Sequence, residues 1–216
     1  MKMFLRMSVA VSVIFFSAAA FAAPDDTWYG GIGFVLARHL PNPATSDESF
    51  VASFPVGTIS RGEDPRGWRI YAGYRFNSFV SFESGYTGGL SSESNARIVD
   101  GRFMETRFRE MELRSLDFSL VAGAPTPVRG LGAFAGLGVE RTMTEIWSRY
   151  DFYFDGVQFF SREEYSRKYD MATVKRVGFV FNPSWSDRNG NWAIRLEHID
   201  GSAGKKSTVL GTQFSF

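Results

Sequence analysis

The sequence predicts an all-β protein, an eight-stranded antiparallel up-and-down transmembrane barrel that is preceded by a cleaved signal peptide. Three observations lead to this fold class. The last residues, 209–216, alternate between apolar and small or polar side chains and end on Phe216. Seven earlier segments repeat this alternation, which is typical of strands with lipid on one face and a packed interior on the other. The N-terminus has the pattern of an export signal.

The export signal sets the first boundary. Lys2 and Arg6 precede a short apolar run, and an A-x-A cleavage motif ends at Ala22. The run is too short to be a membrane-spanning helix, because such a helix needs ~20 apolar residues. We therefore expect a signal peptide over 1–22 and a single barrel domain over 23–216.

Composition supports this fold class. Aromatic residues make up 16% of the chain, with 22 Phe, and mean hydropathy is −0.14. Strands that are apolar only at every second position combine these two properties. The absence of Cys excludes disulfides and thiolate metal sites, and no cofactor is expected. A net charge of +1 gives no indication of nucleic-acid binding.

The first four expected strands place apolar side chains on alternate residues, where they would face lipid. These outward residues are Trp28, Ile32, Phe34 and Leu36 in 28–38, Trp68, Ile70, Ala72, Tyr74 and Phe76 in 68–76, Val80, Phe82 and Tyr86 in 80–87, and Leu116, Phe118, Leu120 and Ala122 in 115–123. The small, polar and charged residues between them would face the interior.

The last four strands follow the same rule. Their outward residues are Leu131, Ala133, Ala135, Leu137 and Val139 in 131–140, Val177, Phe179 and Phe181 in 177–182, Trp192, Ile194, Leu196 and His198 in 192–199, and Leu210, Thr212, Phe214 and Phe216 in 209–216. Pro125 and Pro127 indicate a turn after the fourth strand, and Pro183 marks the end of the sixth strand or a bulge.

Connection lengths alternate along the chain. The links after the second, fourth and sixth strands are tight, whereas 39–67, 88–114 and 141–176 are expected to be long loops. Outer-membrane barrels have short periplasmic turns and long extracellular loops. Within the last of these loops, Asp155-Gly156 lies between β-prone runs and predicts a type I′ hairpin.

Several short segments resemble the OmpA-like transmembrane barrels: 23–30, 73–77, 82–86, 195–197, and Leu210-Gly211 with Phe214 and Phe216. The resemblance implies a monomeric, non-enzymatic barrel in the outer membrane of a Gram-negative-type bacterium. Its role would be in envelope integrity and in surface interaction or adhesion. Its expected partners are outer-membrane lipid, lipopolysaccharide, the barrel-assembly machinery (through the last strand) and a host or surface ligand.

Seven charged residues fall on the expected interior faces: Arg69, Arg75, Glu83, Asp117, Glu140, Arg195 and Glu197. Buried charges persist only when they are paired, so we expect a charge network that closes the interior. The resemblance implies that Glu83 and Arg195 form its plug. Exchanging both charges at once is expected to recover much of the stability that is lost when Glu83 is replaced by Ala. The family's lumenal Lys falls at Val121, so the alternative partner for Glu83 is absent there. A conducting pore for small solutes is the other interpretation.

Two aromatic groups are expected outside the interior. Membrane-interface anchors would be Trp28, Trp68, Trp185, Trp192, Phe214 and Phe216. Loop residues that could contact a ligand are Tyr150, Phe152, Phe154, Phe159 and Phe160, although such aromatics also stabilise a hairpin by packing on one another. The charged residues of 102–114 are expected to form a solvated face.

An enzymatic alternative involves His198. Outer-membrane lipid A deacylases are similar barrels with a membrane-facing His-x-Ser and an acid on the next strand. Here Asp200 stands two residues after His198, and no Asp or Glu follows between Gly201 and Phe216. Because a triad needs nucleophile, base and orienting acid together, we expect an interfacial histidine and no catalytic residue.

Overall fold

The computed structural model describes residues 28–39, 56–61, 65–77, 79–128, 130–182, 192–201 and 205–215, and every regular element in these ranges is a β-strand. No helix among them is long and apolar enough to cross a membrane. The strands are β1 Trp28–His39, β2 Val56–Arg61, β3 Arg66–Arg75, β4 Val80–Asp100, β5 Phe103–Pro125, β6 Leu131–Phe154, β7 Val157–Phe181, β8 Trp192–Asp200 and β9 Lys206–Ser215.

Eight of these strands close into a ring. Neighbours pair antiparallel in the order β1, β3, β4, β5, β6, β7, β8, β9, and β9 pairs with β1. The predicted eight-stranded barrel is therefore confirmed. A ninth strand, β2, which the sequence does not predict, pairs among the described residues with 94–99 of β4.

The outside of the ring is a belt of large apolar side chains. Exposed examples come from all around the wall and include Phe34, Leu120, Leu137, Val177 and Leu210, with Leu120 59% exposed. Water does not favour so much exposed apolar surface, whereas the hydrocarbon core of a membrane does. Closed barrels with such a belt are the architecture of outer-membrane proteins, and this protein is one.

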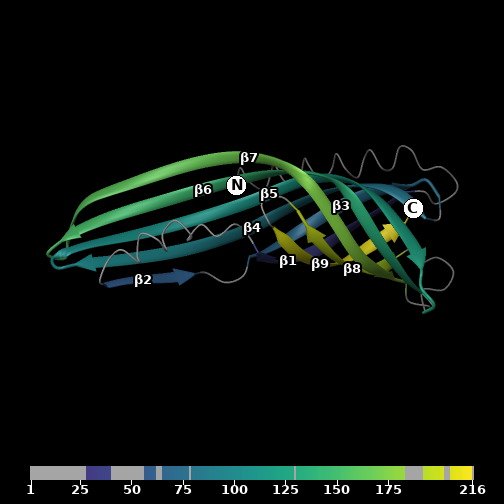
Figure 1. Cartoon of the computed structure of the whole chain (residues 1–216), viewed down its shortest axis with the longest axis horizontal. Helices are drawn as coiled ribbons and strands as arrows, with labels where there is room; N and C mark the ends of the chain where they lie inside the picture. Colours follow the sequence, from purple (N-terminus) through teal and green to yellow (C-terminus); the bar gives the residue numbers. More distant parts are fainter. Residues whose placement is uncertain are drawn as a thin grey trace.

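Four neighbouring strands continue far beyond the ring. Strands β4, β5, β6 and β7 have 21 to 25 residues, and their distal halves form a curved sheet that extends to one side (Figure 1). We call the part formed by 90–114 and 141–174 the extracellular sheet. Paired strands thus fill most of the connection 88–114, so the expectation of a long loop there is wrong. In 141–176 the strands on either side of Asp155-Gly156 continue beyond the membrane as a hairpin, as that turn predicts.

The extension is possible because strand pairing does not depend on lipid-facing alternation. Beyond the membrane both faces of a sheet can be polar, and cross-strand pairs still stabilise it. The apolar alternation stops at Tyr86, where the register between β4 and β5 shifts between Thr87 and Leu90. Gly89, with φ of 73°, allows this bulge.

Turn chemistry distinguishes the two ends of the barrel. At the far tip of the extracellular sheet Asp155 and Gly156 have φ of 48° and 79°, the left-handed pair that a type I′ hairpin requires. At the opposite end, the Asn77 side chain accepts hydrogen bonds from the backbone N–H of Phe79 and Val80 in a tight turn. By the rule of short periplasmic turns, this end faces the periplasm and the extension points outward.

Candidate functional site

The interior of the ring holds a cluster of ionisable side chains. Alternate residues of every strand point inward, so charges from six strands, and from Lys205 just before β9, converge on one axis. Eight of them are at most 3% exposed: Arg69, Glu83, Asp117, Glu140, Arg176, Arg195, Glu197 and Lys205. We call this group the lumen network.

Glu83 of β4 is the centre of the lumen network. One of its oxygens lies 2.6 Å from a terminal nitrogen of Arg195, and Arg176 also binds this carboxylate directly. Arg69 lies 3.7 Å away, and the Tyr29 hydroxyl donates a hydrogen bond of 3.1 Å. A carboxylate can accept about four hydrogen bonds, so the surrounding cations satisfy it without water.

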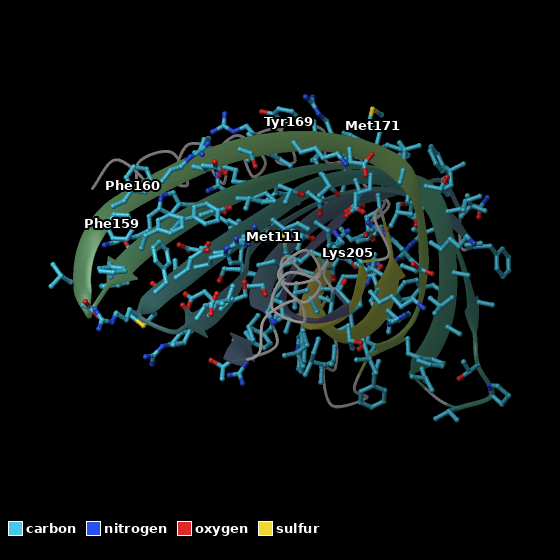
Figure 2. The ribbon with its side chains drawn as sticks, turned by 60° about the vertical axis from the view of Figure 1, so that its left-hand side comes forward. Met111, Phe159, Phe160, Tyr169, Met171 and Lys205 are labelled. Atoms are coloured by element: carbon cyan, nitrogen blue, oxygen red, sulfur yellow. The ribbon has the colours of Figure 1, made fainter. Side chains whose placement is uncertain are left out.

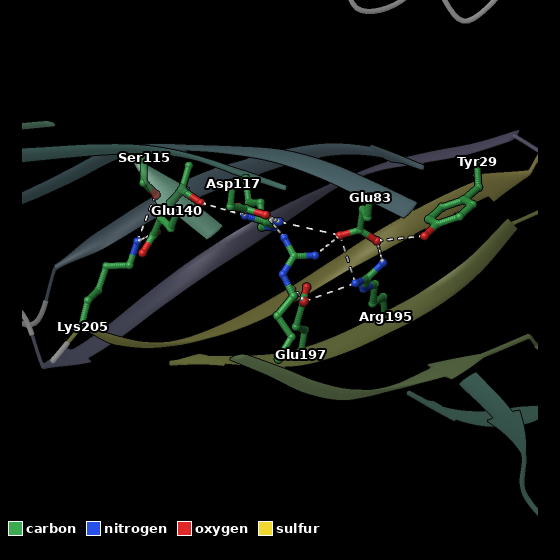
Figure 3. A network of polar contacts seen from close by, with 11 residues as sticks. Tyr29, Glu83, Ser115, Asp117, Glu140, Arg195, Glu197 and Lys205 are labelled. Atoms are coloured by element: carbon green, nitrogen blue, oxygen red, sulfur yellow. Dashed lines mark hydrogen bonds and ion pairs between the residues drawn. The ribbon is translucent and has the colours of Figure 1, made fainter. Parts of the chain in front are cut away.

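Asp117 and Glu197 are the acids on either side of Glu83. The guanidinium of Arg69 donates two hydrogen bonds, of 2.6 and 3.1 Å, to the Asp117 carboxylate, and Arg176 binds the same carboxylate. Glu197 lies 3.2 Å from Arg195 and 3.6 Å from Arg176. Arg69 and Arg195 therefore each bridge two acids and Arg176 bridges three, and the network is continuous across the barrel (Figure 3).

A further ion pair lies nearer the extracellular end. The ammonium of Lys205 binds Glu140 and donates a hydrogen bond of 3.0 Å to the Ser115 hydroxyl. With this pair, the eight groups comprise four cations and four acids. Such balance is what burial demands, because an unpaired charge in this interior would lose its hydration without compensation.

Aromatic rings and glycines make room for the large guanidinium groups. Arg195 lies between the rings of Tyr71 and Phe134, at 4.4 and 4.3 Å from their centroids. Gly85 faces Arg69, and a Cβ at this position would collide with the guanidinium. The network is thus held by shape as well as by charge.

The two ends of the interior differ. Toward the extracellular side an apolar cluster fills the space, since Leu113, Val174 and Ile199 each lie two residues beyond a polar interior residue of their strand. Toward the periplasm a vestibule of about 420 Å³ opens, and it reaches Tyr29 and Arg195. The described part of the interior is therefore closed outward and partly open inward.

Six of the seven sequence-predicted interior charges belong to this network. Arg75 does not, because its guanidinium lies over the Tyr29 ring at 5.7 Å, on the wall of the vestibule. Arg176 and Lys205 also belong to the network, although the sequence did not predict them as interior charges. Continuing the inward face of β7 from Gly178, and that of β9 from Val209 through Ser207, would have found both.

Position 121 does carry a buried Val, as the sequence shows. The family's lumenal Lys is therefore missing at this place. Arg69 and Arg176 nevertheless reach Glu83 from β3 and β7, in addition to Arg195.

The expected interface anchors lie at both rims of the apolar belt. Trp28 packs edge-on against Tyr74 at 5.0 Å at the periplasmic rim, where Trp192 and Phe214 are partners in register. Trp68 packs on Tyr86 at 5.4 Å at the opposite rim. Trp185, Phe216 and the signal peptide lie outside the described residues.

The aromatic residues of the hairpin tip contact one another and stay largely exposed. Phe152 lies 5.6 Å from Phe160, and Phe103 of the adjacent hairpin lies 5.5 Å from Phe159, which is 58% exposed. Tyr150, farther from the tip, lies under the Arg107 guanidinium. Figure 2 shows Phe159 and Phe160 at the tip, with Tyr169 and Met171 on the outer side of β7.

The charged residues of 102–114 form ion pairs as part of β5. Arg114 binds Glu112 at 2.8 Å and lies 3.7 Å from Glu145 of β6, and Arg167 of β7 binds Glu145 at 2.5 Å. These groups lie on the partly exposed outer face of the extracellular sheet.

His198 is exposed on the outer face of β8, with Val177 and Thr208 as its partners in register. The described ranges contain no group of three His, Asp or Glu side chains that could hold a metal ion.

Comparisons with known proteins return structures of similar architecture at low identity. The outer membrane protein OprG from Pseudomonas aeruginosa matches over 88% of this chain and 96% of its own, with 11% identity and a TM-score of 0.49. The N-terminal β-barrel domain of OprF from the same organism covers 88% and 98%, with 12% identity and a TM-score of 0.45. Ail, the attachment invasion locus protein of Yersinia pestis, covers 88% and 99%, with 12% and 0.45.

No protein-family model matches the sequence, and no curated protein matches it. The fold assignment rests on the strand pairing of the chain itself.

Proposed function

We propose that this protein is a non-enzymatic outer-membrane barrel with a plugged interior, which contributes to envelope integrity and makes surface contacts through its extracellular sheet. The lumen network is the observation that carries the proposal. An eight-stranded interior is only wide enough to be filled by side chains, and here charges that bind one another fill it. The apolar cluster beyond the network supports the same conclusion.

Electrical recording tests the plug. The purified protein, reconstituted into planar bilayers, is expected to give little or no steady conductance, because arginine and carboxylate side chains occupy the axis. Replacing both Glu83 and Arg176 by Ala removes one charge of each sign and two large side chains, so the double variant is expected to conduct more. Large and steady channels from the wild type would contradict the plug.

A small-solute pore is the second candidate, and the periplasmic vestibule favours it. That space of about 420 Å³ reaches Arg195, which leaves only the network and the apolar cluster as the barrier. The pore would require rearrangement of both layers. The same recordings decide between the two functions.

The enzymatic alternative has a direct test. Mass spectrometry of lipid A from cells with and without the protein is expected to show the same acyl chains. A missing acyl chain that reappears in the His198→Ala strain would replace this proposal by a lipid-modifying activity.

The surface role is tested in cells. Loss of the gene is expected to make cells more sensitive to detergents, and re-expression is expected to restore resistance. A variant with a shortened extracellular sheet is expected to restore detergent resistance but not the adhesion of the cells to surfaces. If deletion leaves both properties unchanged, the proposed role fails.

A further inference from the structure

A groove of about 500 Å³ lies on the outer face of the extracellular sheet, away from the barrel interior. It crosses the distal halves of β4, β5 and β6, and Thr58 of β2 borders it. Phe108 is separated from Leu116 and Phe118 by an even number of residues along β5, so all three side chains lie on the same face of the strand. That face contacts lipid in the ring and carries the groove in the extracellular sheet. The groove therefore opens sideways, toward the layer above the membrane surface.

Two aromatic rings form the floor of the groove. Phe108 and Trp147 meet edge to face, with centroids 5.5 Å apart, and both are only half-buried. Phe108 has Asn95 as its register partner on β4 and Arg149 on β6. An apolar ring surface between hydrogen-bonding side chains suits a ligand that has both apolar faces and hydroxyl groups, as a sugar does.

Arg149 is held so that its terminal nitrogens remain available. Its Nε donates a hydrogen bond of 3.1 Å to Asp151, whose carboxylate also accepts from Ser161 at 2.7 Å and Gln158 at 3.1 Å. The acid is therefore already satisfied. Glu163 of β7 is the cross-strand partner of Arg149 and faces the same side, but within the described residues it forms no hydrogen bond or ion pair with the guanidinium, so the terminal nitrogens of Arg149 are not bound to an acid. A fixed guanidinium with free donors is suited to binding an anion in two-pronged fashion.

Arg97 supplies a second cation on the opposite side of the floor. It is exposed, and in the described part of the chain it has no ion-pair partner. Arg97 on β4 and Arg149 on β6 are separated by two strand spacings and by two residues along the strand direction. By standard sheet geometry their Cα atoms are roughly 12 Å apart. Two cations at this separation can each bind an anionic group of one short oligosaccharide.

We propose that this groove binds the phosphorylated saccharide of neighbouring lipopolysaccharide, with a sugar ring on Phe108 and Trp147 and phosphates on Arg97 and Arg149. The inference rests on the proposed function, because it names the partner of the extracellular sheet. Two observations select this occupant: the excess positive charge of the groove, and its opening toward the sugar layer that surrounds an outer-membrane barrel.

Titration calorimetry tests the site with the full-length barrel in lipid nanodiscs. The probe is the phosphorylated core oligosaccharide released from lipopolysaccharide by mild acid, and the same oligosaccharide after phosphate removal is its control. We expect the phosphorylated probe to bind at least about tenfold more tightly, since each charge-assisted contact contributes more than the 1.4 kcal/mol that a factor of ten represents.

Matched variants locate the binding. Arg97→Gln with Arg149→Gln, and separately Trp147→Ala, are expected to weaken binding about tenfold or more. Arg162→Gln, on the other face of the sheet, and Phe159→Ala, at the tip, should leave it unchanged. Absence of binding, equal binding by the groove variants, or tighter binding of a soluble sulfated oligosaccharide than of the core probe would overturn the assignment. The conductance and lipid A tests do not involve the groove, so they would still stand.

Discussion

At the scale of single residues, Glu83 is the group whose loss disturbs the most contacts. Replacing it by Ala leaves Arg69, Arg176 and Arg195 without their shared acid. Removing one partner of a buried ion pair costs about 3–5 kcal/mol, and we expect a loss of this size in the free energy of unfolding. Urea titration in phospholipid vesicles measures it. Glu93→Ala on the exposed part of the same strand is the control and should change stability by less than about 0.5 kcal/mol.

Exchanging the charges of Glu83 and Arg195 separates a network from a pair. For an isolated pair the exchange would restore much of the stability. Here an arginine at position 83 would face Arg69 and Arg176, so we expect the exchanged protein to be no more stable than Glu83→Ala. Recovery to near the wild-type value would show that only the one pair matters.

Glu145, on the outer face of the extracellular sheet, offers a test by pH. The Tyr165 hydroxyl and then the Arg167 guanidinium donate hydrogen bonds to its carboxylate and hold its pKa below the ordinary value. A lowered pKa means that this stabilisation is present above the ordinary pKa of a glutamate and is lost as pH falls through the lowered one. We expect Tyr165→Phe and Arg167→Gln each to raise the pKa of Glu145, as followed by NMR titration. An unchanged pKa in both variants would contradict this assignment, and Arg162→Gln should have no effect.

At the scale of elements, the hairpin between β6 and β7 depends on its left-handed turn. Gly156 has φ of 79°, and open space surrounds it. Gly156→Ala therefore adds no clash, but it costs about 1–2 kcal/mol because an L side chain disfavours this backbone conformation. We expect faster amide hydrogen exchange near the tip and unchanged exchange in the ring. Gly101→Ala, in the neighbouring hairpin, is the control and should instead raise the exchange rate at the β4–β5 tip. A uniform rise in the exchange rate through the whole barrel would refute a local effect.

The sequence predicts the ring well and the extension poorly, for one physical reason. In the ring, lipid forces apolar residues onto every second position, and segments such as 131–140 show this plainly. Residues such as Glu110 and Glu163 lie in strands without that constraint, and no alternation marks them. The Asp155-Gly156 turn was the one local signal that the chain continued as paired strands.

For the interior, the alternation along each strand predicts which charged residues face inward. It does not predict which of these residues form ion pairs with one another. Glu83 and Asp117 could be assigned to the interior from alternation alone. Their shared arginine, Arg176, depends on the stagger between β4 and β7, which are distant around the ring. Arg75 has the correct parity and still lies outside the network, because it is too close to the periplasmic rim.

At the scale of the whole molecule, the ring should be independent of the extracellular sheet. No member of the lumen network lies in 90–114 or 141–174, so none belongs to the extracellular sheet. Replacing 93–110 and 147–165 by two-residue Asn-Gly turns is expected to leave a folded barrel in detergent, with a strand-type far-ultraviolet spectrum and a cooperative thermal transition. A variant that no longer folds would show that the extension belongs to the same cooperative unit.

The distribution of the buried charges along the chain has a consequence for assembly. In the strands made first, Glu83 and Asp117 outnumber Arg69, whereas in the later strands Arg176, Arg195 and Lys205 outnumber Glu140 and Glu197. Each half of the growing barrel therefore carries an excess of one sign, and only the other half can neutralise it. A half-built wall is therefore expected to be less stable in hydrocarbon than the closed ring, because it keeps a buried charge without a partner. The pairing of β9 with β1 brings the two halves together, so closure of the ring also completes charge neutralisation.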